Sequence, residues 1–139
     1  MTDRQTLLEK VRACEGADRL LDEALMMAFY TRDVRFIGAT CEGCDCPDAP
    51  RHKDPVWVDP MTDRWVSTNA YEFTGSVDRA LALVAKVLPG WDWMRLAGGR
   101  MLVFDPARHK ATFAGEAKTP ALALLAALLT ALLAEEAGK

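Results

Sequence analysis

The chain lacks an excess of charge of either sign. Its 139 residues include 17 Lys and Arg against 20 Asp and Glu, which gives a net charge of −3 at pH 7. A protein that neutralises a phosphate backbone needs clustered cations, and the basic residues here are scattered among acidic ones. The charge balance therefore argues against strong nucleic-acid binding.

The chain also lacks an apolar run long enough to cross a bilayer. The longest stretch without a charged residue is Thr119 to Ala134, whereas a spanning helix needs about twenty residues. The first twelve residues, MTDRQTLLEKVR, carry charges where a signal peptide has its apolar region. We expect no membrane segment, a cytoplasmic location in a host cell and reduced cysteines.

Motifs of known catalytic chemistry are missing as well. Ser67 and Ser76 have no G-x-S-x-G setting, and His109 stands between Arg108 and Lys110 without an accompanying nucleophile pattern. These residues are better explained as turn and capping residues. We therefore expect that the protein is not an enzyme.

What is present is a dense cysteine segment, CEGCDCPDAPRH. Cys41, Cys44, Cys46 and His52 supply three thiolates and one imidazole within twelve residues, the ligand set of a closed tetrahedral zinc site. Four protein ligands leave no open position for a water molecule, so such a Zn²⁺ would be structural rather than catalytic. Cys14 is a reserve ligand if Cys44 and Cys46 cannot both turn inward.

Two other interpretations of this segment stay open. The three cysteines could be reduced thiols without a metal. A redox role is less favoured, because Glu42 and Asp45 are acidic neighbours that raise thiol pKa values.

Apolar spacing predicts helices at both ends of the chain. An N-terminal helical hairpin is expected, followed by a serine-capped helix and a C-terminal Ala/Leu helix that begins with Thr119 as N-cap and Pro120. The expected ranges are Thr6 to Ala13, Asp18 to Tyr30, Ser76 to Val87 and Thr119 to Glu135. The final helix is apolar on nearly all sides, so the sheet, the hairpin or a second subunit in a homodimer must cover it.

Three strands are expected between the last two helices. They are Trp91 to Leu96, Met101 to Asp105 and Lys110 to Ala114, with Gly98-Gly99 and Asp105-Pro106 as turns. The second half thus reads α-β-β-β-α. The fold class is α+β in one domain over residues 1–139, with a three- or four-stranded antiparallel sheet packed by helices. Because Trp91 and Trp93 share one face of their strand, both are expected to be buried.

Residues 31–65 break this regularity. Glycines and prolines punctuate the segment, and it reads as an irregular, cysteine-bearing loop or insertion. Three short aromatic or β-branched patches could form edge strands: Trp57 to Val58, Arg64 to Ser67 and Ala70 to Phe73.

Three segments resemble a family of small phage and prophage proteins of unassigned function, the phage ABA-sandwich domain. They are GADRLLDEAL, YEFTGSVDRALALVAKVLPGW and TPALALLAALLTAL. The family's tyrosine, capping serine, sheet-opening tryptophan and Thr-Pro-Ala-Leu-Ala start correspond to Tyr71, Ser76, Trp91 and Thr119 to Ala123. The resemblance implies the fold and a phage origin, and it brings no catalytic residue. The segment from Thr40 to His52 looks like an addition to the family pattern.

The leading functional hypothesis is a phage-encoded accessory protein that binds a host or phage protein and could inhibit a bacterial defence factor. Its expected contact surface is the loop from Gly38 to Trp65, with Trp57, Trp65, Arg51 and Lys53 as candidate partner-binding residues. The alternative is a zinc-dependent regulatory or nucleic-acid-associated module in which Arg51, His52 and Lys53 contact phosphate. Double-stranded RNA-binding domains share the α-β-β-β-α order, but the last helix here has only Lys118 before it where they carry a lysine cluster.

Overall fold

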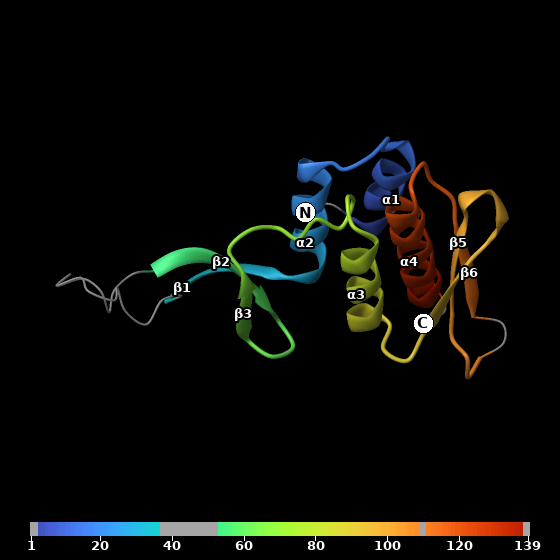
Figure 1. Cartoon of the computed structure of the whole chain (residues 1–139). Coiled ribbons are helices and arrows are strands. Elements are labelled where there is room, and N and C mark those ends of the chain that lie inside the picture. The colour runs from blue at the N-terminus through green and yellow to red at the C-terminus, as the bar shows by residue number, and fades with distance from the viewer. Residues whose placement is uncertain (1–2, 37–52, 109–110, 138–139) are drawn as a thin grey trace, which may run out of the picture.

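The computed structural model describes residues 3–36, 53–108 and 111–137 and has the α+β fold (Figure 1). Within these ranges, helices and strands follow the order α-α-β-β-β-α-β-β-β-α. They are α1 (Arg4–Ala13), α2 (Arg19–Phe29), β1 (Thr31–Phe36), β2 (Lys53–Asp59), β3 (Arg64–Ser67), α3 (Val77–Val87), β4 (Asp92–Arg95), β5 (Met101–Phe104), β6 (Thr112–Gly115) and α4 (Pro120–Ala137), with a short 3₁₀ turn at Ala97–Gly99.

The C-terminal helix α4 is the centre of the core. Every residue from Ala121 to Leu129 is buried, as are Ala131 and Leu132. Helices α1 and α3 pack on one side of α4 and strands β5 and β6 on the other (Figure 1). The chain itself therefore covers the apolar helix, which removes the need for a second subunit to do so.

Length and composition alone would allow α4 to span a bilayer, and among the described residues it is the one helix that meets this criterion. The core helix of a soluble protein meets the same criterion. Its burial between helices α1 and α3 and strands β5 and β6 accounts for its apolar composition.

Short polar side chains start the helices, as the sequence predicts. The side chains of Asp18, Ser76 and Thr119 accept backbone N–H groups in the first turns of α2, α3 and α4. Helix α1 begins at Arg4 rather than Thr6, because Asp3 is its N-cap and accepts the N–H of Thr6 at 2.7 Å.

Strands β4, β5 and β6 form the expected antiparallel meander. Met101, Val103 and Gly115 project toward α4. Trp93 lies opposite Val103 on the same face, yet 43% of it is exposed, so the prediction that it is buried is wrong. The reason is that β4 is the edge strand, whereas α4 packs on β5 and β6. Trp91 is half-buried and stacks on Phe113.

The irregular loop predicted over residues 31–65 is wrong at both of its ends. Strands β1, β2 and β3 form another antiparallel sheet, which extends away from α4 (Figure 1). In chain order it is the first sheet, and β4, β5 and β6 form the second. The patch at Arg64–Ser67 is strand β3, whereas residues 70–73 are not a strand. Residues 37–52, which join β1 to β2 in sequence, lie outside the described residues.

Two local features explain why the sequence did not reveal this sheet. Pro55 lies in β2 opposite Val34, in the part of β2 that pairs only with β1, because β3 begins to pair at Trp57. A proline is tolerated where one side of a strand has no neighbour. Strand β1 is mostly polar and exposed, so it shows no alternation of apolar residues.

The outer strands β1 and β4 share a detail of their backbone. Asp33 accepts the N–H of Val34 at 2.8 Å, and Asp92 accepts the N–H of Trp93 at 2.8 Å. In each strand, the side chain of one residue thus accepts the backbone N–H of the next residue along the chain.

Gly115 lets β6 approach α4 closely. A Cβ atom on this residue would lie 2.0 Å from the carbonyl oxygen of Ala123 and 2.3 Å from the amide nitrogen of Ala127. Gly115→Ala is expected to destabilise the fold by about 3 kcal/mol or more, because backbone must move to make room. Chemical denaturation measures the free energy of unfolding.

Gly16→Ala is the matched control, since a Cβ there meets nothing within 4 Å. It should change stability by less than about 0.5 kcal/mol. Equal stability of the two variants would contradict the close contact between β6 and α4.

Candidate functional site

The predicted zinc ligands Cys41, Cys44, Cys46 and His52 lie outside the described residues, as does Arg51. The backbone of Lys53 belongs to β2 and pairs with Phe36. Cys14, the reserve ligand, is half-buried at the end of α1, and its Sγ donates to the carbonyl oxygen of Gly16 at 2.9 Å. Across residues 3–36, 53–108 and 111–137, no group of three or more His, Cys, Asp or Glu could hold a metal ion.

The two tryptophans predicted to contact a partner lie on opposite faces of the first sheet. Trp57 is 5% exposed and belongs to the main core, with the guanidinium of Arg32 4.8 Å from its ring centre. Trp65 is 42% exposed and pairs with Val58, on the face turned away from the core. The structure thus leaves Trp65 accessible and makes Trp57 a core residue, which differs from its predicted exposure.

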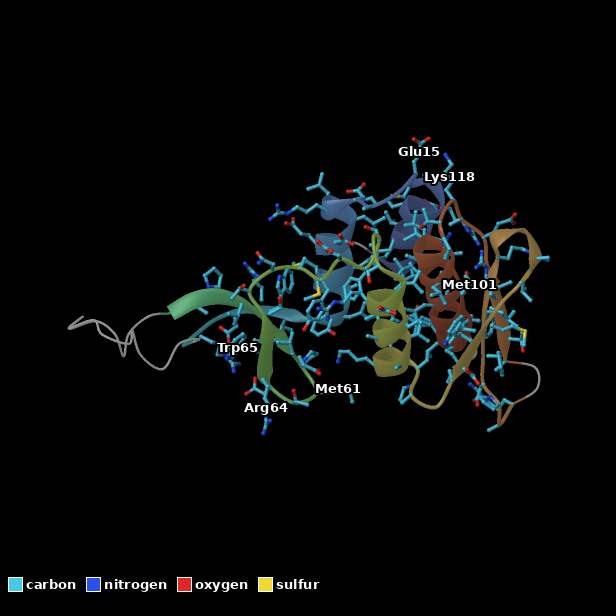
Figure 2. The ribbon with its side chains drawn as sticks, viewed as in Figure 1. Glu15, Met61, Arg64, Trp65, Met101 and Lys118 are labelled. Carbon is cyan, nitrogen blue, oxygen red and sulfur yellow. The ribbon has the colours of Figure 1, made fainter. Side chains whose placement is uncertain are left out.

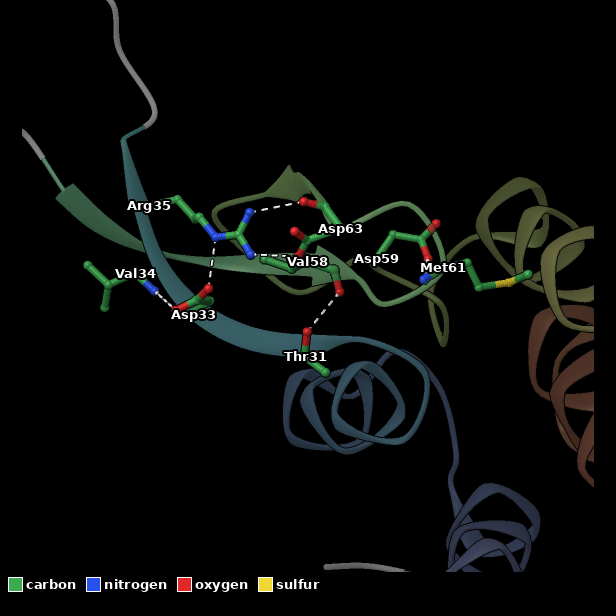
Figure 3. Close-up of polar contacts among 8 residues, drawn as sticks. All are labelled: Thr31, Asp33, Val34, Arg35, Val58, Asp59, Met61 and Asp63. Carbon is green, nitrogen blue, oxygen red and sulfur yellow. Dashed lines mark hydrogen bonds and ion pairs between the residues drawn. The ribbon is translucent and has the colours of Figure 1, made fainter.

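An arginine network covers the face of the first sheet that carries Val56 and Val58 (Figure 3). Arg35 donates to Asp33 at 2.8 Å and to both the carbonyl oxygen and the carboxylate of Asp63 at 2.9 and 2.8 Å. The hydrogen bond from Arg35 lowers the pKa of Asp33, and the bond to Asp63 contributes most to the raised pKa of Arg35. Two carboxylates therefore neutralise this arginine.

An ion pair joins the first sheet to the helices. Lys86 on α3 donates to Asp59 at the end of β2 at 2.8 Å, and both side chains are less than one-fifth exposed. The Lys86 ammonium also lies 5.0 Å from the ring centre of Tyr30, which meets Tyr71 edge to face. Burial raises the pKa of Tyr30 to about 12. These contacts fix the base of the sheet against α2 and α3.

Three residues on β3 and the turn before it are exposed, and we call them the β3 patch: Met61, Arg64 and Trp65 (Figure 2). Arg64 and Trp65 are neighbours on the strand, so their side chains lie on opposite faces of it. Met61 is 81% exposed and Arg64 is exposed. Within the described part of the chain, Arg64 makes no ion pair. Tryptophan, arginine and methionine are enriched in protein interfaces, and tryptophan and arginine dominate their binding energy.

A groove runs beside α2, formed by two hollows of about 500 and 320 Å³ that share Arg19, Asn69 and Ala70. In the larger hollow lies Asp22, which is 5% exposed and whose Oδ1 accepts both the N–H and the hydroxyl of Thr74 at 2.8 Å. Burial raises the pKa of Asp22, and the bonds from Thr74 oppose this shift. We call these joined hollows the α2 groove.

Comparison with known proteins gives no assignment: no protein-family model, curated protein or solved structure matches the chain. The sequence does not show that Trp57 is buried while Trp65 is exposed. This difference depends on the pairing of β2 with β3.

The ion pair between Asp59 and Lys86 should make stability depend on pH. The hydrogen bond from Lys86 lowers the pKa of Asp59 in the folded protein. The stabilisation is therefore complete above the unfolded-state pKa of about 4 and is lost as pH falls through the lower folded-state value. Asp59→Asn should reduce the free energy of unfolding by about 1 kcal/mol at pH 7.

Urea denaturation of both proteins between pH 3 and pH 7 measures this difference, which should shrink at the acid end. Glu116→Gln, an exposed change elsewhere, is the control and should show no such trend. A loss of stability in Asp59→Asn that stays constant down to pH 3 would contradict the role of the ion pair.

Proposed function

We propose that this chain is a phage-encoded, non-enzymatic accessory protein that binds a host or phage protein through the β3 patch. A bacterial defence factor is one such partner, and the host cytoplasm is the expected compartment. The observation that carries the proposal is the exposure of Trp65, together with that of Arg64 and Met61, on a sheet that extends away from the core.

A rigid support makes this patch suitable for binding. Trp65 pairs with Val58 of β2, and the neighbouring Trp57 is part of the main core. The ion pair between Asp59 and Lys86 holds the end of the same strand on α3. An aromatic side chain on a fixed strand loses little conformational entropy when a partner covers it.

The Arg35 network does not provide a site for a nucleic acid. Arg35 is neutralised by Asp33 and Asp63, so it is not free to contact phosphate. The alternative, a zinc-dependent nucleic-acid module, would depend on Arg51, His52 and Lys53 instead. The phage origin and the proposed partner class follow the resemblance of three segments to phage ABA-sandwich proteins.

Zn²⁺ bound by Cys41, Cys44, Cys46 and His52, in a structural role, is part of the proposal. The pairing of Phe36 with Lys53 supports it, because it brings together the two described residues that flank the cysteine segment. Closing a loop in advance reduces the entropy that metal binding must overcome.

Trp65→Ala should abolish the capture of a partner from a phage-infected bacterial lysate and should reduce the affinity of the purified partner at least tenfold, which corresponds to about 1.4 kcal/mol. Trp93→Ala is the matched control, since Trp93 is exposed to nearly the same extent, 43%, but lies on the other sheet. It should leave capture unchanged. Partner binding that survives Trp65→Ala would refute the proposed surface.

Elemental mass spectrometry on protein purified without a chelator or a histidine tag should find one zinc ion per chain. Cys44→Ser should lose it, because three remaining ligands bind zinc much more weakly than four. Cys14→Ser serves as the control and should keep the metal, as its thiol already donates to Gly16. Zinc-free protein would leave the cysteines as reduced thiols and remove the metal from the proposal.

A further inference from the structure

The α2 groove has opposite charges at its two ends. Asp22 and Glu72 line the larger hollow, and Arg32 lines the smaller one. Arg19, which both hollows share, lies 3.9 Å from Glu23 of the same helix, so these two charges largely cancel. What remains is a negative end and a positive end.

The negative end lacks a cation of its own. The carboxylate of Asp22 is bonded through Oδ1 to Thr74, and within the described ranges nothing hydrogen-bonds to Oδ2. Glu72 is exposed and makes no ion pair with a described residue. Burial is the main cause of the raised pKa of Asp22, and the nearby charges of Glu72 and Asp18 raise it further. An ammonium or guanidinium group entering this hollow would relieve that repulsion.

The positive end lacks an anion. Arg32 stacks on Trp57 and donates one hydrogen bond, to the carbonyl oxygen of Thr68 at 3.4 Å. A guanidinium has five N–H donors in a planar fork that fits a carboxylate. No carboxylate of the described residues forms an ion pair with it. Stacking on the indole holds the fork in place at the groove.

Between the two ends the surface is suited to a main chain. The side chain of Asn69, which both hollows share, offers both a donor and an acceptor, and Met27 in the smaller hollow is 64% exposed and gives an apolar contact. Such a surface fits backbone amides and a small side chain better than a second charge.

We propose that the α2 groove binds an extended peptide segment of a partner protein, with a lysine or arginine side chain against Asp22 and Glu72 and an aspartate or glutamate side chain against Arg32. This inference rests on the proposed function, because it gives the chemistry of the partner that an accessory protein of this kind would bind. It adds a second contact on the Trp57 face of the first sheet, opposite the face that carries Trp65.

Nuclear magnetic resonance titration of the full ¹⁵N-labelled chain with synthetic peptides tests the inference directly. The probes are acetylated and amidated peptides with one lysine and one glutamate, in both orders and separated by one to four alanines. At least one should shift the amides of Asn69, Ala70 and Gly75 in a saturable way. The same peptide with both charges replaced by glutamine should bind about tenfold more weakly.

Single substitutions test the negative and the positive end of the α2 groove separately. Glu72→Gln and Arg32→Gln should each reduce the affinity for the active peptide about tenfold and should remove the preference for the charged over the uncharged peptide. Glu116→Gln and Arg95→Gln, exposed changes away from the groove, are the matched controls and should not affect binding. Asp22 is left unchanged because its carboxylate also holds Thr74.

The inference is overturned if no peptide gives a saturable shift at millimolar concentration, or if charged and uncharged peptides bind equally. These outcomes do not affect the β3 patch, which is tested separately by partner capture with Trp65→Ala. If Trp65→Ala loses partner capture and no peptide binds, the proposed function stands and only the α2 groove is rejected as a peptide-binding site.

Discussion

Burial of α4 is the constraint on which the rest of the structure depends. A helix that is apolar around its whole circumference needs cover on every side, and each fully buried leucine contributes about 1.5–3 kcal/mol. Helices α1 and α3 and strands β5 and β6 provide that cover. The close approach of β6 at Gly115 and the small alanines of α4 are consequences of the same requirement, because they let a strand and three helices meet without a gap.

The first sheet stands outside this arrangement. One of its faces contributes Trp57 to the core, while the other is covered by the Arg35 network and ends in exposed Trp65. Its attachment to the helices includes the mostly buried ion pair between Asp59 and Lys86, and Tyr71, whose hydroxyl donates to the carbonyl oxygen of Val66 and whose ring meets Tyr30 edge to face. Both surfaces considered for binding, the β3 patch and the α2 groove, lie on or beside this sheet, where side chains are not needed to cover α4.

Capping residues and apolar periodicity predicted the helices and the second sheet well. Asp18, Ser76 and Thr119 mark real helix starts, and Gly98-Gly99 makes the turn between β4 and β5 with positive φ angles. These signals are local, so the sequence contains them. The first sheet could not be predicted in the same way, since β1 is polar and Pro55 suggested a break where the strand merely lacks a second neighbour.

The exposure of each tryptophan could not be predicted from the sequence either. Trp57 and Trp65 looked alike as candidates, and so did Trp91 and Trp93. Whether each is buried depends on which strand lies at an edge and how far a helix reaches across the sheet, and both are set by contacts between residues distant in sequence. The α2 groove is also a product of such contacts, because Arg32 and Asn69 come together only after the sheet has docked on α2.

The aspartates on the outer strands limit how this protein can associate with others. With the amides of Val34 and Trp93 already bonded to Asp33 and Asp92, a foreign strand that added to β1 or β4 would meet an occupied donor and a negative charge at the same place. Addition of a strand from another molecule at the β1 or β4 edge is thereby disfavoured, which leaves β3 and β6 as the strands through which either sheet could be extended.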